Sequence, residues 1–286
     1  MRFGWLTLSL SPSPQEDAAR IDQQIEQVCF AEQLGFSDVW LTEHYFTGES
    51  VYNDALLFAS AVAMRTEKIR IGFAVVQLPF HHPVRLAVQL ALLDNLSRGR
   101  IDVGVGKGTI YNEYEFVGHG LRSDDSRERM EESVDIIRRL WSGGPVTYSG
   151  RYFHVQVPEL RPRPVQLPHL PLWRSVISPS SFSECGRLGV PILTARLPVA
   201  RIKDRWAPTR RGSMPADMTP GPKRVCWRKA PYGATFISRN PVRRRRTSWQ
   251  LCCCGPAHDA CARRVQSGGF HHQPGDAEPL GRSGRR

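Results

Sequence analysis

The sequence predicts an α/β fold, a (β/α)8 barrel that stops after about six strands and continues as an irregular basic tail. Strand-like and helix-like segments alternate at barrel-like spacing over residues 1–206. The first strand is not followed by GxGxxG, the motif of a doubly wound dinucleotide-binding sheet. After Trp206 the hydrophobic periodicity disappears. We therefore predict an incomplete barrel domain over residues 1–206 and a separate tail over residues 207–286.

The clearest strand–helix–strand unit lies between residues 68 and 112. Residues 69–76 form an almost unbroken apolar run rich in β-branched side chains, as in a strand buried on both faces of a parallel sheet. Pro83 suits the first turn of a helix, where its missing N–H costs nothing, and Gly99 suits the end of that helix. Residues 100–105 are the next strand, which leads into a glycine-rich loop. The apolar stripe of the helix is expected at Val84, Val88, Ala91, Leu92 and Asn95.

The remaining segments extend the same alternation in chain order. Strands are expected at residues 2–8, 38–41, 172–177 and 190–193, with a β-hairpin at 146–157. Loops are expected at residues 42–53, 111–123 and 161–171. Helices are expected up to Gly35 (face Ile21, Ile25, Val28, Cys29), from Asn53 or Asp54 to Met64, from Asp124 and Asp125 to Gly143 (face Met130, Val134, Ile137, Trp141), from Ser178 to Gly189, and from Pro198 to Trp206.

Charge is distributed unevenly along the chain. Residues 1–206 hold 23 Lys+Arg and 23 Asp+Glu, whereas residues 207–286 hold 16 and 4 and so carry the whole net charge of +12. The N-terminus resembles a strand rather than a signal peptide, and no apolar run is long enough to span a membrane. The two cysteines of the first part, Cys29 and Cys185, fall in predicted helices and suit a reducing compartment. These features predict a cytoplasmic protein.

The tail has an unusual composition, with nine prolines, nine glycines and five of the seven cysteines. We interpret residues 207–286 as the product of a shifted reading frame near residues 206–210, because GC-rich DNA read out of frame yields such residues. A disordered basic tail is the alternative. The scattered aromatic residues do not favour nucleic-acid binding, and the spacing of Cys252, Cys253, Cys254 and Cys261 does not favour a metal site.

Several words of the sequence carry a family resemblance. IGFAVVQLP, HPVRLA, LLDNLSRGR and GVGKG, together with GFSDVWLTEHYF upstream, resemble the bacterial luciferase family of flavin-dependent monooxygenases over roughly residues 1–205. The resemblance implies a barrel that would continue with a seventh and an eighth strand. We see nothing similar to those strands after residue 206.

Candidate site residues follow the predicted strands, where a barrel of this kind carries its functional groups. His44 aligns with an essential histidine of the family and would exchange protons with substrate or a flavin-bound oxygen species, although sequence alone favours a buried structural histidine. The luciferases often have a second histidine where this chain has Tyr45.

The expected cofactor site comes from three further positions. Ala74 and Val75 match a family position where a non-prolyl cis peptide bond supports the flavin ring, or they are simply part of a buried strand. Gly106, Lys107 and Thr109 would contact the flavin phosphate, unless Lys107 is a solvated turn residue. Ser178 and Ser181 would add hydroxyl groups at a helix N-terminus, a role that is compatible with helix capping.

The other histidines show no metal-ligand pattern, and no metal is expected. We interpret His81, His82, His119, His154 and His169 as surface or loop residues, and Arg98 and Arg100 as anchors of a helix-to-strand turn.

The resemblance implies an enzyme that takes reduced FMN from a separate flavin reductase and uses dioxygen to oxygenate a small organic substrate. A homodimer is also implied. Three alternatives stay open: a deazaflavin-dependent enzyme that transfers hydride, a non-catalytic flavin-binding barrel, and an inactive truncated homologue.

Overall fold

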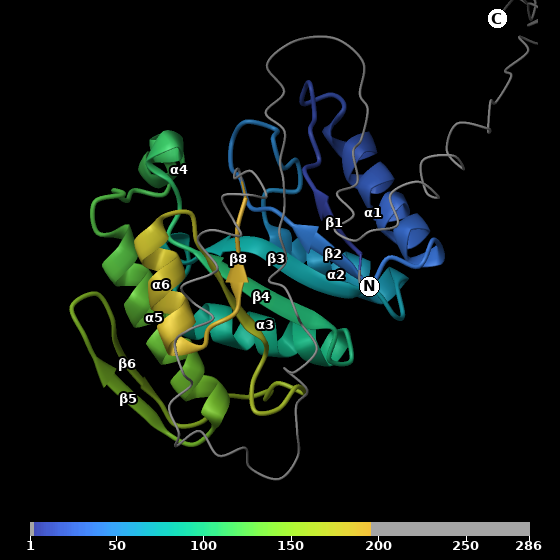
Figure 1. Cartoon of the computed structure of the whole chain (residues 1–286). Helices are drawn as coiled ribbons and strands as arrows, with labels where there is room; N and C mark the ends of the chain where they lie inside the picture. Colours follow the sequence, from blue (N-terminus) through green and yellow to red (C-terminus); the bar gives the residue numbers. More distant parts are fainter. Residues whose placement is uncertain (1–2, 196–286) are drawn as a thin grey trace, which may run out of the picture. The chain divides into compact units, whose positions relative to one another are not determined.

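The computed structural model describes residues 3–195, apart from the side chain of residue 110. In this range six parallel strands form one curled sheet (Figure 1). This half-barrel confirms the predicted fold class. The helix expected from Pro198 and the tail over residues 207–286 lie outside the described residues. The sheet order is β1 (Gly4–Thr7), β2 (Asp38–Leu41), β3 (Arg70–Gln77), β4 (Ile101–Gly106), β7 (Leu172–Ser175) and β8 (Ile192–Leu193).

The connections between strands are mostly helical, and consecutive helices pack on one another in the order of the strands. These are α1 (Asp17–Gln33), α2 (Ala55–Arg65), α3 (Pro83–Leu96) and α5 (Ser126–Ser142). The antiparallel hairpin β5 (Val146–Ser149) and β6 (His154–Val157) lies beside α5 (Figure 1). The last connection is α6 (Pro179–Leu188).

Local sequence signals account for several element boundaries. The Asp54 carboxylate accepts hydrogen bonds from the amides of Leu56 and Leu57 and so begins α2. Ser178 accepts from the Ser181 amide at the start of α6, and Gly189 ends that helix in the left-handed region at φ 65°. The predicted caps at Asp54, Ser178 and Gly189 are therefore confirmed.

The core is built from strands that are buried along most of their length. All six residues of β4 are buried. Trp40 of β2 lies across Gly72 of β3, where a Cβ atom would approach its ring to 2.3 Å, so only glycine fits there. The Trp40 ring meets Trp173 of β7 edge to face at 5.7 Å. These large side chains fill the concave side of the sheet between strands that are not neighbours.

Two sequence predictions are wrong. Leu92 and Asn95 of α3 are exposed, and the buried face of α3 runs through Leu86, Leu90 and Leu93 instead. Apolar residues occur on several faces of α3, so the pattern of its sequence does not determine which face packs against the sheet. The expected loop over residues 111–123 also contains a helix, α4 (Glu113–Gly118), preceded by a 3-10 turn (Ile110–Asn112).

None of the helices over residues 3–195 has the length and apolar character needed to cross a bilayer. The expected cytoplasmic location stays a prediction.

Candidate active site

The candidate site lies where neighbouring strands end. β2, β3, β4 and β7 are adjacent in the sheet and run parallel, so their carboxyl ends lie along one edge. His44 follows β2, Ala74 and Val75 belong to β3, and Lys107 follows β4. Ser178 and Ser181 follow β7 at the start of α6. The structure thus brings the sequence-predicted residues to a common edge.

Two residues in the middle of β3 are more exposed than the residues on either side of them. Ala74 and Val75 are half-buried, whereas residues 71–73 and 76–77 are buried. The peptide bond between Ala74 and Val75 is cis, as the family resemblance implies. Val75 also packs against Gly106 of β4, where a Cβ atom would approach Val75 Cγ2 to 2.6 Å. Two predicted cofactor positions are therefore in direct contact and leave a small, apolar, partly accessible surface.

A polar region lies beside this apolar surface. Lys107 is exposed and forms no ion pair with a residue in the described range. Thr109 accepts a hydrogen bond from the Tyr111 amide. The hydroxyl of Ser178 lies 2.8 Å from that of Ser181 and 3.0 Å from that of Ser180. A Cβ atom at Gly106 would lie 3.8 Å from Ser175 Cβ, so the chain leaves β4 and β7 at neighbouring points.

The residue types at this edge suit a flavin-type cofactor such as FMN. The flat isoalloxazine ring needs an accessible apolar surface such as Ala74–Val75, and the phosphate needs positive charge with hydroxyl or amide donors. Lys107, Thr109, Ser178 and Ser181 supply those groups, and Ser178 and Ser181 stand at a helix N-terminus, which favours anions.

The His44 ring pairs with the buried carboxylate of Glu115. Its Nδ1 lies 3.3 Å from Glu115 Oε1, and the Glu115 side chain is fully buried. Glu115 also accepts hydrogen bonds from the Tyr45 amide at 2.9 Å and from Gln77 Nε2 at 3.1 Å. Burial by itself raises the pKa of Glu115, but these three donors outweigh burial and the pKa is lowered. The carboxylate is therefore ionised at neutral pH.

The ionised Glu115 determines the tautomer of His44. The Asn112 amide nitrogen lies 3.2 Å from the same Nδ1 and would need a lone pair there, whereas Glu115 needs a proton. The buried anion loses more from an unmet hydrogen bond, so Nδ1 carries the proton. In this tautomer the lone pair of the ring is on His44 Nε2.

A second buried carboxylate, Glu43, escaped the sequence analysis together with Glu115. Tyr45 Oη donates to Glu43 Oε1 at 2.5 Å, and His81 Nε2 lies 2.7 Å from the same oxygen. The pKa of Tyr45 is raised, first by burial and then by the Glu43 charge, so the phenol keeps its proton. Tyr45 is therefore the donor in its hydrogen bond with Glu43.

The other predicted positions behave as expected. His82 and His154 are exposed. His81 lies in a loop and also pairs with the buried Glu43, and His119 is an exposed turn residue whose ring stacks on Phe80 at 4.6 Å. Arg100 is confirmed as an anchor, because its guanidinium donates to carbonyl oxygens of Ser97, Ile69, Ala63 and Thr66.

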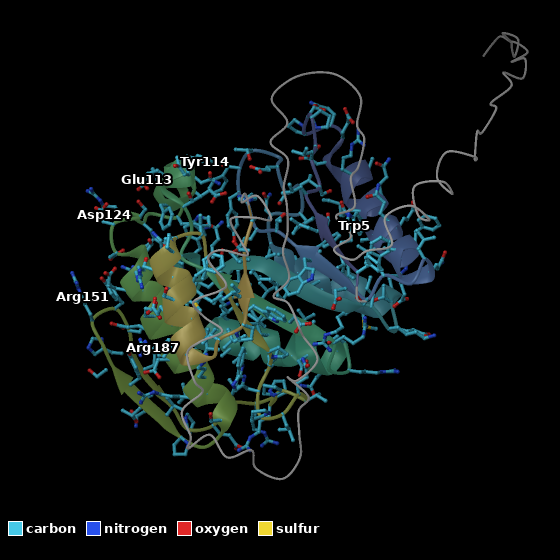
Figure 2. The ribbon with its side chains drawn as sticks, viewed as in Figure 1. Trp5, Glu113, Tyr114, Asp124, Arg151 and Arg187 are labelled. Atoms are coloured by element: carbon cyan, nitrogen blue, oxygen red, sulfur yellow. The ribbon has the colours of Figure 1, made fainter. Side chains whose placement is uncertain are left out.

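Glu115 lies on the short helix α4, whose two faces differ. Tyr114, on the outer side in Figure 2, is exposed, whereas Glu115 and Phe116 are buried. Helix α4 packs over the loop after β4, since a Cβ atom at Gly108 would meet the Phe116 ring at 2.7 Å. Helix α4, which the sequence analysis expected to be part of a loop, therefore supplies Glu115, the partner of His44.

The described residues thus form a parallel half-barrel whose carboxyl edge carries His44, Lys107 and the serines at the start of α6. The model of the luciferase-like monooxygenase family matches residues 1–234, which extends past the expected boundary at residue 206. The chain belongs to the luciferase-like monooxygenase family.

Individual relatives include oxygenases and a dehydrogenase. The chain is 35% identical over 190 residues to limonene 1,2-monooxygenase of Rhodococcus erythropolis, covering 65% of this chain and 48% of the relative. It is 29% identical over 182 residues (63% and 50%) to the oxygenase component of flavin-dependent trigonelline monooxygenase of Acinetobacter baylyi. It is 29% identical over 198 residues (68% and 56%) to F420-dependent glucose-6-phosphate dehydrogenase of Microbacterium testaceum. The chain thus spans about half the length of these curated relatives.

A solved structure supports the same grouping. Monooxygenase RslO1 from Streptomyces bottropensis superposes with a TM-score of 0.69 and 29% sequence identity, covering 74% of this chain and 65% of that chain.

Proposed function

We propose that this protein is a flavin-dependent monooxygenase that binds reduced FMN at the carboxyl edge of the sheet and oxygenates a small organic substrate with dioxygen. The observation that carries the proposal is the combination of His44, held by the ionised Glu115, with the Ala74–Val75 surface and the Lys107–Ser178–Ser181 cradle on adjacent strands. The family membership and the limonene and trigonelline monooxygenases among the relatives support it.

The residues of the chain would divide the work as follows. Lys107 attracts the phosphate, and the hydroxyl groups of Thr109, Ser178 and Ser181 hydrogen-bond to it. Ala74 and Val75 support the ring. When bound, reduced FMN supplies the oxygen activation that no amino-acid side chain provides. His44 Nε2 exchanges a proton with the substrate or with a cofactor-bound group, while Glu115 stabilises the imidazolium that results.

A separate flavin reductase is the proposed partner. The trigonelline enzyme among the relatives is described as an oxygenase component, which implies a second component that supplies reduced flavin. A homodimer is proposed as well. Exposed apolar side chains on two adjacent helices support it: Leu57 and Met64 of α2, and Leu92 and Leu96 of α3.

The alternative that a specific observation favours is a deazaflavin-dependent hydride-transfer enzyme. The F420-dependent dehydrogenase among the relatives supports this alternative, since F420 is a deazaflavin and has a phosphate that the same cradle fits. His44 would then accept a proton from an alcohol as the hydride leaves.

The test compares reduced FMN with oxidised F420 on the full chain. We expect reduced FMN to bind, and ¹⁸O from ¹⁸O₂ to appear in an organic probe from a panel that includes limonene, in wild-type protein but not in His44→Ala. Hydride transfer to oxidised F420 from an alcohol panel, with no ¹⁸O incorporation, would replace the proposal with the alternative. Binding of reduced FMN with product formation unchanged in His44→Ala would instead indicate a non-catalytic flavin-binding barrel.

A further inference from the structure

Glu43 is a completely buried carboxylate that the proposed chemistry does not use. Its side chain has no exposed surface. It accepts hydrogen bonds from the phenol of Tyr45, from the backbone amide of Gln77 at 2.5 Å, and from His81. The carbonyl oxygen of Glu43 also accepts from Gln77 Nε2 at 2.9 Å. Every one of these donors lies on the end of β3, on the turn after it, or on the loop that carries His44.

His81 connects this buried group with the surface. It follows the 3-10 turn Leu78–Phe80, and it lines a surface cavity of about 210 Å³ between the starts of α2 and α3. The ionisable groups around it are Glu43 and Tyr45 on the inner side and Asp54, His82 and Arg85 at the cavity.

We propose that Glu43 is a positioning residue, paired with His81, that fixes the backbone of the loop bearing His44. This inference rests on the proposed function, because the residue that Glu43 positions is His44, the proposed proton-exchanging group. Glu43 and Tyr45 flank His44 in sequence, and both are tied to the end of β3, Glu43 through Gln77 and Tyr45 through the Glu43 carboxylate. Glu115 fixes the same loop from the other side through the Tyr45 amide.

The charge of Glu43 is needed because all three groups that face its carboxylate are donors. A glutamine at this position keeps the shape but turns an NH₂ group toward one of them. The unmet donor in a fully buried site is costly, and the loop relieves it by moving. A shift of His44 by about 1 Å is enough to lower a catalysed rate about 100-fold.

The ion pair also makes the loop sensitive to alkaline pH. Burial lowers the pKa of His81, but the charge and hydrogen bond of Glu43, with a further contribution from Asp54, outweigh burial and raise the pKa. A raised pKa means that the contribution of His81 is fully present below its ordinary value of 6.5 and is lost as pH rises through the folded value. The loop should therefore loosen on the alkaline side.

The test compares Glu43→Gln with Glu32→Gln in the full chain. Glu32 is a matched control because its carboxylate also accepts three hydrogen bonds, from the amides of Glu67, Lys68 and Ile69, but at the opposite end of the sheet. At a temperature where both variants are folded, we expect kcat of Glu43→Gln to fall about 10- to 100-fold. We expect FMN affinity to be retained in both variants and kcat per folded molecule of Glu32→Gln to be unchanged.

A second readout needs neither flavin nor activity. Side-chain NMR titration should show a lower His81 pKa in Glu43→Gln than in wild type, with the His44 ring resonances displaced and broadened. In Glu32→Gln both should match wild type. His81→Gln keeps a donor that does not titrate, so the alkaline loss of activity should disappear in that variant.

The two possible failures are distinguishable. If the wild-type chain incorporates no oxygen, the proposed function fails, and the NMR comparison still decides the inference about Glu43. If Glu43→Gln leaves the His44 resonances in place, or loses no more kcat than Glu32→Gln, Glu43 has only a structural role and the inference is overturned.

Discussion

The two ends of the parallel sheet carry similar ionisable residues but use them differently. At the amino end, Glu32 accepts hydrogen bonds from three backbone amides, and Asp94 accepts from the Val165 and Gln166 amides at 2.8 and 2.9 Å. Arg100 donates to backbone carbonyl oxygens there. At the carboxyl end, Glu43 and Glu115 each accept one backbone amide, from Gln77 and Tyr45, and bond in addition to the imidazole rings of His81 and His44.

The difference indicates what each end does. A charged side chain whose hydrogen bonds all go to backbone groups holds a turn in place and is not available to bind a ligand. A carboxylate that bonds to an imidazole orients the ring, as Glu115 does for His44. This difference agrees with what is general in parallel barrels: residues at the amino end of the strands stabilise the fold, and active-site residues lie at the carboxyl end. Four predictions test whether the two ends differ in this way.

The largest effect is expected for His44→Ala. Loss of the proton-exchanging ring should lower turnover about 10²- to 10⁴-fold. The melting temperature should fall as well, because the buried Glu115 loses a hydrogen bond. His154→Ala is the matched control, since that histidine is exposed on the β5–β6 hairpin. Steady-state kinetics and thermal melts of both variants decide the matter. Equal turnover in the two variants would remove the distinction between the ends.

The next effect, on stability, is expected for Asp94→Asn at the amino end. Asp94 is fully buried, so losing part of its charged hydrogen bonding should cost about 2 kcal/mol. That corresponds to a melting temperature lower by about 4–8 °C. Calorimetry measures the shift, and turnover per folded molecule should be unchanged. A loss of turnover without destabilisation would assign a functional role to the amino end.

A smaller effect, on cofactor affinity, is expected for Lys107→Met. Removing one charge from the phosphate cradle should weaken FMN binding about 10-fold, or about 1.4 kcal/mol. The substitution should not change stability, because Lys107 is exposed. Lys68→Met provides the control, since Lys68 is an exposed lysine at the amino end. Fluorescence titration measures the FMN affinity of both variants. Equal affinities would show that Lys107 does not contact the phosphate.

The smallest effect separates the two roles of the serines on α6. Ser178→Ala should destabilise the chain by about 1 kcal/mol, because it removes the N-cap of α6. Ser181→Ala keeps the cap and should weaken only FMN binding. Melting curves and FMN titrations of both variants test this. A similar loss of stability in both would show that the serines act only on the helix.

Sequence alone predicted the elements whose boundaries are set locally. The strand at 38–41, the helix that starts at Pro83 and the caps at Asp54 and Ser178 all depend on residues close in the chain. The buried face of α3 was missed because tertiary packing chooses between several apolar faces. Helix α4 was missed because six residues are too few for a periodic pattern.

The site was predicted in part for the same reason. His44 and Lys107 were found from motifs that follow strands, whereas their supporting residues were not. Glu115 is 71 residues from His44, and His81 is 38 residues from Glu43, so only the fold brings these pairs together. One signal was available: adjacent parallel strands place the loops after β2, β3 and β4 side by side, which makes acidic residues in those loops candidates for partners of His44.

The most direct test of the account is amide hydrogen exchange of the full chain with and without FMN. We predict slower exchange on FMN addition at residues 74–77, 106–109 and 178–181, the segments at the carboxyl end. Exchange should be unchanged at residues 66–70 and 94–101, the turns at the amino end. Protection confined to the amino end, or no protection anywhere, would contradict the assignment of the carboxyl end as the flavin site.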